Sequence, residues 1–439
     1  MNFKQRIEIE NKVLDKIAGR VFLLQVESER KRIVIEALQE VLTEEPYKNI
    51  KEDAEFSFDD LVNSIISYGF IDELLADPLV EDIMINYLSP VLVHTARQGL
   101  VVLERSFSSQ EELELFIKKL IVFSGRREVK KINNVELTGL RGRANIIFSP
   151  LGHQITITRA KERVLSIVDL VELGTLNSYM AAQLWLYVEG LGIKPANIII
   201  AGGPGVGKST LLNSLFSFIP RSERIVVIED TLELNTERLG SYSRLTSDDD
   251  MSLESLVKNS LRMRPDRIIV GEVRGEEAKD LITALLVGKY GMGTIHAATS
   301  REIITRMTSE PMNTPEVLIG VIDVFVIMRQ YRIHNKTKRV INEICEGSGM
   351  EKGKVLLSSI WGYNLSTDSF RETTVGGGFR DRLAELSGRS PREIMDEIRL
   401  RALIIEAMLK KGIKEFLAVS DVVARYFNNP SSVLSELGI

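Results

Sequence analysis

A glycine-rich segment of nine residues constrains the fold of this chain more than any other feature. An apolar, mostly β-branched run at residues 198–201 has the character of a buried strand, and the motif GGPGVGKST follows at residues 202–210. A helical pattern begins at the end of this motif. The spacing GxxxxGK[ST] between a strand and a helix is typical of a phosphate-binding loop, whereas a glycine-rich turn without a ligand is the structural alternative.

The residue types in this segment suit a nucleotide bound with Mg²⁺. Glycine frees the backbone to curl, so that successive N–H groups and the positive end of the helix dipole converge on phosphate oxygens. We expect Lys208 to reach the β- and γ-phosphates of ATP and the Ser209 hydroxyl to hold Mg²⁺. The predicted nucleotide-binding residues are Gly202, Gly203, Gly205, Val206, Gly207, Lys208, Ser209 and Thr210.

Composition places the chain among ordinary globular proteins. It has 439 residues, of which 44% are hydrophobic and 27% are charged, and this length favours two or three domains. A net charge of −5 gives no overall attraction to nucleic acid or anionic lipid, although a local basic groove stays open as an alternative. Cys345 is the only cysteine, which excludes an internal disulfide and a multi-cysteine zinc site and fits a reducing cytoplasm.

The sequence predicts a cytoplasmic protein whose contact with a membrane is peripheral. Its first residues are charged and lack the apolar core of a signal peptide. The longest apolar run, residues 317–328, is twelve residues long and contains Asp323. This run is too short and too polar to span a bilayer.

Two domains are predicted before the phosphate loop. Residues 1–55 form a helical segment, which we interpret as a solvated helical pair, with a partner-docking surface as the alternative. The apolar positions of this segment are Val13, Ile17, Val21 and Leu24. Residues 56–159 combine short alternating runs with one helix near residues 111–123, which indicates a small α+β domain. The polar residues 160–166 serve as a connector.

The remainder is predicted to be a nucleotide-binding domain with a tail. Over residues 167–345, strand patterns alternate with helical patterns, which is typical of an α/β fold with a mostly parallel sheet. Residues 346–439 contain a β-hairpin and then helices. One of these helices starts at Ser390, with Pro391 at the first helical position and Glu393 completing a capping box. We expect the last helix to end at residues 429–430.

Two strands of the predicted sheet end in carboxylates. The first delivers Glu229, Asp230 and Glu233 to the carboxyl edge, where a parallel sheet presents its ligand site. Carboxylates near a γ-phosphate can orient the attacking water, although any one of these could instead cap the next helix. On the second strand Gly271 stands where a common P-loop ATPase carries an aspartate. Glu272 must then act alone by polarising water or holding a metal-bound water, with a purely structural role as the alternative.

A histidine follows the next predicted strand. Thr294 and His296 alternate with apolar residues, which places a hydroxyl and an imidazole on one face. A lone histidine is most often structural. After two acidic strands, however, we interpret His296 as a sensor of the γ-phosphate.

These motifs in this order resemble the type II/type IV secretion ATPases. The motifs that carry the resemblance are the phosphate loop, the acidic segment 228–233, the segment 264–275 and the TIHA motif at 294–297. The resemblance covers residues 60–345 and implies a P-loop, RecA-like motor domain in ring-shaped hexamers that power pilus assembly, the archaellum, and protein or DNA export. The tail is similar to that of archaeal members, which favours an archaeal-type pilus, archaellum or secretion ATPase.

The resemblance also implies roles for single residues. The family's catalytic groups match Glu229, Glu233, Glu272, Arg143, Arg159 and His296, and its metal ligands match Ser209, Glu272 and Asp230. The two arginines correspond to residues that the N-terminal domain presents to nucleotide, and a permanently charged, forked guanidinium suits a transferring phosphoryl group. A basic surface patch is the alternative for either arginine.

Two positions depart from the family pattern. Lys289 stands where members usually have the first histidine of the histidine box, which leaves open whether it replaces that residue. Members often have a second arginine shortly after the one matched by Arg244, and this chain does not.

We therefore expect a hexameric cytoplasmic ATPase that uses Mg-ATP hydrolysis and interdomain closure. Its expected partners are itself, a polytopic membrane platform protein and, indirectly, pilin-like or secreted subunits, without direct contact to nucleic acid. A conjugation-type ATPase that translocates nucleic acid is one alternative. A nucleotide-gated assembly module with negligible hydrolysis is the other.

Overall fold

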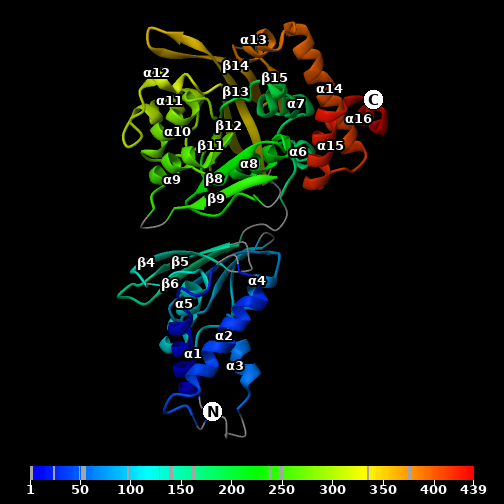
Figure 1. Ribbon diagram of the computed structural model, residues 1–439. Helices are drawn as coiled ribbons and strands as arrows, with labels where there is room; N and C mark the ends of the chain where they lie inside the picture. The colour runs from blue at the N-terminus through cyan, green and yellow to red at the C-terminus, as the bar shows by residue number, and fades with distance from the viewer. Residues whose placement is uncertain are drawn as a thin grey trace. The chain divides into compact units, whose positions relative to one another are not determined.

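The computed structural model in Figure 1 describes residues 3–22, 25–48, 50, 56–95, 98–127, 129–137, 142–159, 164–236, 240–247, 251–333, 336–373 and 378–439. The chain divides into two compact units, Met1–Glu162 and Arg163–Ile439. The predicted connector, residues 160–166, overlaps this division, and its residues 160–163 lie outside the described residues. None of the helices in the described ranges has the length and hydropathy needed to cross a lipid bilayer.

The first unit combines helices with one antiparallel sheet. Its elements are α1 (Phe3–Ile17), α2 (Glu27–Val41), α3 (Phe58–Ile66), α4 (Ile71–Ala76), β1 (Val80–Asn86), β2 (Leu92–Thr95), β3 (Gly99–Val102), α5 (Gln110–Phe123), β4 (Ile132–Glu136), β5 (Gly142–Ile147) and β6 (Gln154–Arg159). The strands lie in the order β3-β2-β1-β6-β5-β4. One face of this sheet packs on α5, as the alternation of buried and exposed residues along β5 and β6 requires.

The N-terminal helices belong to the core of this unit. Val13, Ile17 and Val21 have no exposed surface, and they share one apolar cluster with α2, α5 and the buried face of the sheet. The prediction of a solvated helical pair is therefore wrong, because the apolar stripe of α1 is covered within the unit itself. The predicted apolar position Leu24 lies outside the described residues.

The second unit contains the phosphate loop and the C-terminal helices. Its first elements are α6 (Ile167–Glu172), α7 (Ser178–Glu189), β7 (Ile198–Ala201), α8 (Lys208–Leu215), β8 (Arg224–Glu229), β9 (Ser241–Thr246), α9 (Leu253–Ser260), β10 (Arg267–Val270), α10 (Glu277–Leu286) and β11 (Tyr290–Ile295). They are followed by α11 (Ser300–Thr308), α12 (Glu316–Ile319), β12 (Val324–Ile333), β13 (Lys336–Glu351), β14 (Lys354–Asn364), β15 (Ser369–Glu372), α13 (Gly378–Ser387), α14 (Pro391–Lys410), α15 (Phe416–Asn428) and α16 (Pro430–Leu437).

A nine-stranded mixed sheet forms the centre of this unit, in the order β15-β14-β13-β12-β7-β11-β10-β8-β9. The strands from β12 to β9 in this order are parallel, and β13, β14 and β15 continue the sheet in antiparallel fashion. The strand before the phosphate loop, β7, lies between β11 and β12. The predicted fold class is confirmed: an α/β, RecA-like P-loop domain with a small α+β unit before it and a mostly helical tail.

Two apolar clusters cover the two faces of this sheet. One joins the sheet to α6, α7, α8 and the C-terminal helices, and the other joins it to α9, α10 and α11 (Figure 1). Ile198 and Ile200 of β7 belong to the first cluster and Ile199 to the second, as strand alternation requires. Because both faces are covered, a ligand reaches the sheet at the ends of its strands.

The antiparallel part of the sheet is longer than the sequence pattern indicated. Strand β13 is sixteen residues long, and the predicted boundary between residues 345 and 346 falls inside it. Cys345 is buried in this strand, and burial raises the pKa of its thiol to about 12. Strands β14 and β15 pair at Asn364 and Ser369, where the sequence predicts a hairpin.

The C-terminal helices follow the predicted start signals and depart from the predicted end. Ser390 and Glu393 form the expected capping box, with Pro391 at the helix start. The predicted end at residues 429–430 is wrong, because another helix follows it. Asn429 caps a further helix, α16, by accepting a hydrogen bond from Ser432 N, and Pro430 takes its first position, where a missing N–H costs nothing.

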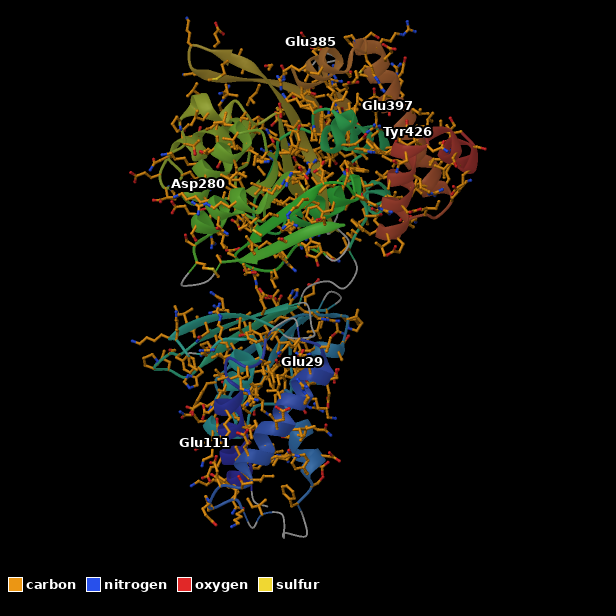
Figure 2. The ribbon with its side chains drawn as sticks, viewed as in Figure 1. Glu29, Glu111, Asp280, Glu385, Glu397 and Tyr426 are labelled. Carbon is orange, nitrogen blue, oxygen red and sulfur yellow. The ribbon has the colours of Figure 1, made fainter. Side chains whose placement is uncertain are left out.

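Buried charge fixes α14 against α7 and α15. The guanidinium of Arg401 lies 2.5 Å from Glu189 and 2.9 Å from Glu397, and it stacks 4.8 Å from the ring centre of Trp185. The Tyr426 hydroxyl donates to Glu397 at 3.1 Å; both residues are labelled in Figure 2. Burial raises the pKa of Glu189, and Arg401 opposes this shift. The cluster is stable as an ion pair only with the guanidinium in place.

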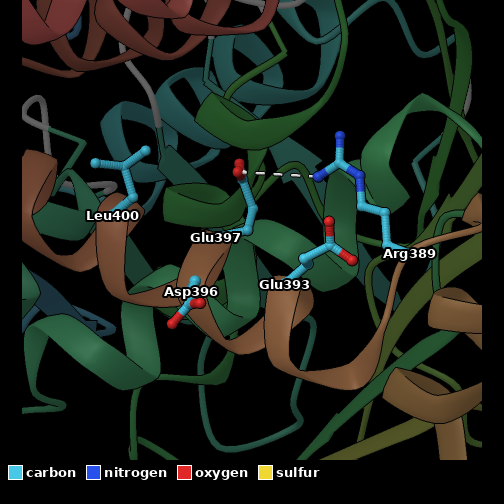
Figure 3. A pocket seen from close by; sticks show the side chains of 5 residues that line it. All are labelled: Arg389, Glu393, Asp396, Glu397 and Leu400. Carbon is cyan, nitrogen blue, oxygen red and sulfur yellow. Dashed lines mark ion pairs between the residues drawn. The ribbon is translucent and has the colours of Figure 1, made fainter.

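Glu397 also lines a surface pocket together with Arg389, Glu393, Asp396 and Leu400 (Figure 3). Arg389 lies 4.0 Å from Glu397, and Glu393 is occupied by the capping box. The polar groups of this pocket therefore stabilise α14. None of its lining residues comes from the phosphate loop or the acidic strands.

Replacing Arg401 by methionine should lower the free energy of unfolding by about 3–5 kcal/mol at neutral pH, because Glu189 and Glu397 would stay buried without a cation. Urea unfolding of the full chain measures this loss. Arg399→Met is the matched control, since Arg399 lies at the surface of the same helix beside Asp396 and should cost about 0–1 kcal/mol. Equal losses in the two variants would contradict a stabilising role for the buried cluster.

Candidate active site

The predicted site residues of the second unit meet at one edge of the sheet. Parallel pairing aligns Ile295 with Ala201, and Val270 with both Gly293 and Ile228, so that β7, β11, β10 and β8 end side by side. The phosphate loop, the acidic segment, Glu272 and His296 each follow one of these strand ends. Their proximity is therefore a consequence of register.

The phosphate loop curls as its glycines allow. Gly207 has a φ of +100° and precedes α8, and Gly202 has a φ of +158°. A Cβ atom on Gly202 would lie 2.6 Å from Val206 Cγ2 and 2.7 Å from the Met328 carbonyl oxygen, so a side chain cannot be accommodated there. The loop thus needs glycine for both conformation and space.

Lys208 is held inside this loop. Its Nζ donates to the carbonyl oxygens of Gly202 at 3.1 Å and Gly203 at 3.0 Å. Burial lowers the pKa of Lys208, while the charges of Glu272 and Glu233 raise it. A buried ammonium group held by carbonyl oxygens is suited to exchange some of these contacts for phosphate oxygens.

Lys208, His296 and Glu272 form a continuous chain of polar contacts. Lys208 Nζ lies 3.4 Å from His296 Nδ1, and His296 Nε2 lies 3.0 Å from Glu272 Oε1. In a neutral imidazole, a proton on Nε2 satisfies both contacts, because Nδ1 then accepts from Lys208 and Nε2 donates to Glu272. Thr294, on the strand that His296 follows, donates to the Gly271 carbonyl oxygen at 2.7 Å and so supports the backbone next to Glu272.

The three carboxylates after β8 have three different surroundings. Glu229 is buried, accepts hydrogen bonds from the backbone N–H groups of Glu233 at 2.9 Å and Leu234 at 2.8 Å, and pairs with Arg244 at 2.9 Å. Burial raises the pKa of Glu229, and Arg244 opposes this shift. These contacts tie Glu229 to the segment that carries Glu233.

Glu233, and not the predicted metal ligand Asp230, lies beside Ser209. Ser209 Oγ donates to Glu233 Oε2 at 2.8 Å, so the predicted metal ligand of the loop is adjacent to Glu233. Asp230 instead pairs with Arg274 at 2.5 Å. A hydroxyl and a carboxylate in contact supply the hard oxygen ligands that Mg²⁺ prefers, so these residues fit an ATP-bound Mg²⁺ ion.

The glycine at position 271 has a packing reason. A Cβ atom on Gly271 would lie 3.0 Å from Glu229 Cγ and 3.6 Å from Glu229 Cβ. Since Glu229 is fixed by two backbone N–H groups and Arg244, it has little freedom to move aside. The aspartate usual at this position and the buried Glu229 compete for the same space.

The two predicted arginines of the first unit lie on opposite faces of its sheet. Arg143 pairs with Thr158 across β5 and β6, whereas the neighbouring pair joins Gly142 to Arg159. Successive residues on a strand alternate in side, so Arg159 shares the side of the buried Ile157, and Arg143 does not. Arg159 also donates from Nη1 to the Asp77 carbonyl oxygen.

Lys289 and Arg339 change the expected list of site residues. Lys289 precedes β11, so it lies at the opposite end of that strand from His296. Arg339, which sequence reasoning missed, donates from Nε to the Gly205 carbonyl oxygen of the phosphate loop at 2.8 Å. Its only sequence signal was a cluster of basic residues at 336–339, without a motif, and the contact spans 134 positions of the chain.

Comparison with known proteins identifies the family. The model of the type II/IV secretion system protein family matches residues 134–354, half of the chain. The chain belongs to this family. The superfamily predicted from the motifs is thereby confirmed.

The relatives of this type II/IV secretion system family member differ in sequence identity and in the share of each chain that is matched. An uncharacterised protein of Methanocaldococcus jannaschii is 29% identical over 84% of this chain and 69% of its own length, in agreement with the archaeal subgroup. The probable conjugal transfer protein TrbB of Sinorhizobium fredii is 35% identical over 39% of this chain and 54% of its own length. The solved pilus retraction motor PilT with bound ADP is 17% identical, with a TM-score of 0.48, over 81% of this chain and 96% of that one.

Replacing Gly271 by alanine should destabilise the protein by about 1–3 kcal/mol, because the added methyl group meets the fixed side chain of Glu229. In a Glu229→Ala background, where this side chain is removed, the same replacement should cost close to nothing. Urea unfolding of the four proteins measures this coupling as a double-mutant cycle. An equal cost in both backgrounds would show that Gly271 is required for a reason other than Glu229.

Proposed function

We propose that this protein is a hexameric cytoplasmic ATPase at the inner face of the cell membrane. Mg-ATP hydrolysis and closure between its two units would power assembly of a type IV pilus-like or archaellum filament, or secretion across the membrane. The observation that carries the proposal is the chain of polar contacts from Lys208 through His296 to Glu272. The hydrogen bond from Ser209 to Glu233 adds a second polar pair at the phosphate loop. Membership of the secretion system family supports it.

The described side chains suit distinct tasks at a triphosphate. When bound, ATP supplies the phosphoryl group and Mg²⁺ offsets the negative charge of its oxygens. Lys208 and the loop N–H groups bind the phosphates, and Ser209 with Glu233 hold the cation. Glu272 receives a hydrogen bond from His296 on Oε1, which orients the carboxylate to accept a proton of the attacking water. Glu229 acts as a positioning residue for Glu233.

Closure is proposed to bring positive charge from the first unit. Arg143 and Arg159 are the groups assigned to it, and a guanidinium that arrives from another unit would make hydrolysis depend on movement. The two side chains occupy opposite faces of one sheet, and Arg159 shares the side of the buried Ile157. We therefore assign the direct phosphate contact to Arg143, which lies on the other face. Arg159, which holds the Asp77 carbonyl oxygen, would support the strand end.

A motor of this kind needs partners that convert closure into work. We propose a ring of six copies, a polytopic membrane platform protein, and pilin-like or secreted subunits moved indirectly. The TrbB relative favours nucleic-acid translocation as a second candidate function. Single-stranded or duplex DNA added to the ring would stimulate ATP turnover under that alternative, and would leave it unchanged under the first proposal.

Lys208→Ala should abolish ATP turnover, because the phosphates lose their buried cation. Phosphate release at saturating ATP measures this effect. Lys289→Ala is the control: it removes the same charge at the far end of β11, and should keep the nucleotide affinity of the unaltered protein. Undiminished phosphate release by the Lys208 variant would exclude the proposed mechanism.

Arg143→Gln should lower the turnover number on the order of 10³-fold while nucleotide affinity stays the same, as expected of a charge that acts on the transition state. Titration with ADP and ATP separates the two quantities. Arg105→Gln removes an arginine from the same unit, where Arg105 pairs with Glu73 at 2.7 Å, and should not change turnover. A turnover number unchanged in Arg143→Gln would remove the assignment of this residue.

A further inference from the structure

The hairpin of β12 and β13 extends past the phosphate loop. Strand β12 pairs with β7 only from Val324 to Ile327, where β7 ends, and continues to Ile333. These six additional residues correspond to roughly 20 Å of strand. Strand β13 pairs with β12 along this extension, so the hairpin projects beyond the edge of the sheet at which the phosphate loop begins.

Arg339 is the residue of this hairpin that reaches the loop. Its register partner is Gln330, and it lies on the same face of β13 as Ile341, which packs in the cluster that contains α8. A Cβ atom on Gly207 would lie 3.7 Å from Arg339 Cδ and 3.6 Å from Met328 Cε. The Arg339 side chain is exposed and donates a hydrogen bond from Nε to the Gly205 carbonyl oxygen at 2.8 Å. A guanidinium has five N–H donors in a fork, so this bond leaves others for a ligand.

The order of strands assigns the two ends of a bound nucleotide to two sides of β7. Lys208 Nζ contacts His296, which follows β11, and Glu272 follows β10, the next strand on that side. The terminal phosphate is therefore expected on the β11 side. The phosphates nearer the sugar must then lie toward β12 and β13, the side from which Arg339 extends.

We propose that Arg339 binds the nucleotide from the β12–β13 hairpin, with its guanidinium on the phosphate next to the sugar of a nucleoside di- or triphosphate. The inference rests on the proposed ATPase function. Arg339 contributes to affinity and not to the chemical step, because its position is remote from Glu272 and His296 along the strand order. The hairpin, and through it the antiparallel part of the sheet, thereby becomes part of the binding site.

Calorimetric titration of the full chain with Mg-ADP and Mg-ATP tests this role. Arg339→Gln should weaken the binding of both nucleotides about ten-fold, as the loss of one hydrogen bond between charged groups predicts, with an unchanged turnover number at saturating ATP. Arg339→Lys keeps the charge and should recover part of the affinity. Arg332→Gln is the matched control, since it removes the same charge from an exposed position of the same hairpin and should bind as the unaltered protein does.

The dependence of ADP affinity on ionic strength distinguishes a direct contact of Arg339 with phosphate from a purely structural contact with the loop. If Arg339 meets a phosphate, the ADP affinity of the unaltered protein should fall more steeply with salt than that of Arg339→Gln, while Arg332→Gln follows the unaltered protein. Equal affinities in Arg339→Gln and Arg332→Gln would overturn the inference. So would a loss shared equally by the glutamine and lysine variants with an unchanged salt dependence. An unaltered protein that binds neither nucleotide would instead refute the proposed function itself.

Discussion

The parallel register of β7, β11, β10 and β8 is the constraint on which the rest of this structure depends. Backbone hydrogen bonds align Ala201, Ile228, Val270 and Ile295 at one edge, and the polar residues of four separate segments follow directly. A shift of one residue on any of these strands would turn its side chains to the other face of the sheet. Backbone pairing therefore determines which side chains meet at the site.

Buried charge appears in two forms in the second unit. Outside the site, Glu229 is a buried carboxylate paired with the partly exposed Arg244, and Arg401 and Glu189 are both buried; each pair fixes one element against another. At the site, Lys208 is held by carbonyl oxygens and one imidazole nitrogen, contacts that a phosphate can replace. The difference lies in the partners: a paired carboxylate satisfies its cation fully, whereas neutral acceptors leave positive charge for a ligand.

Part of the site could be predicted from sequence because its residues follow strand ends in a motif order. Lys208, Glu272 and His296 do meet, as strand alternation and parallel pairing required. The individual tasks of the three carboxylates could not be derived in this way. Whether Glu233 or Asp230 faces Ser209 depends on how residues 230–234 fold back onto Glu229, which is set by two backbone hydrogen bonds and by Arg244 from the next strand. The N-terminal helices were likewise visible as helices, but their burial depended on α5 and the sheet, which lie far along the chain.

Local interactions were enough to predict the phosphate loop, the strand before it and the capping box at Ser390, since each depends on residues within a few positions of one another. The tertiary structure decided the contacts between distant segments: Arg339 on the loop, Gly271 against Glu229, and Arg143 and Arg159 on opposite faces of a sheet. Such contacts leave no periodic signal. They arise from strand order and register, which are selected by the burial of the whole core and not by any short segment of it.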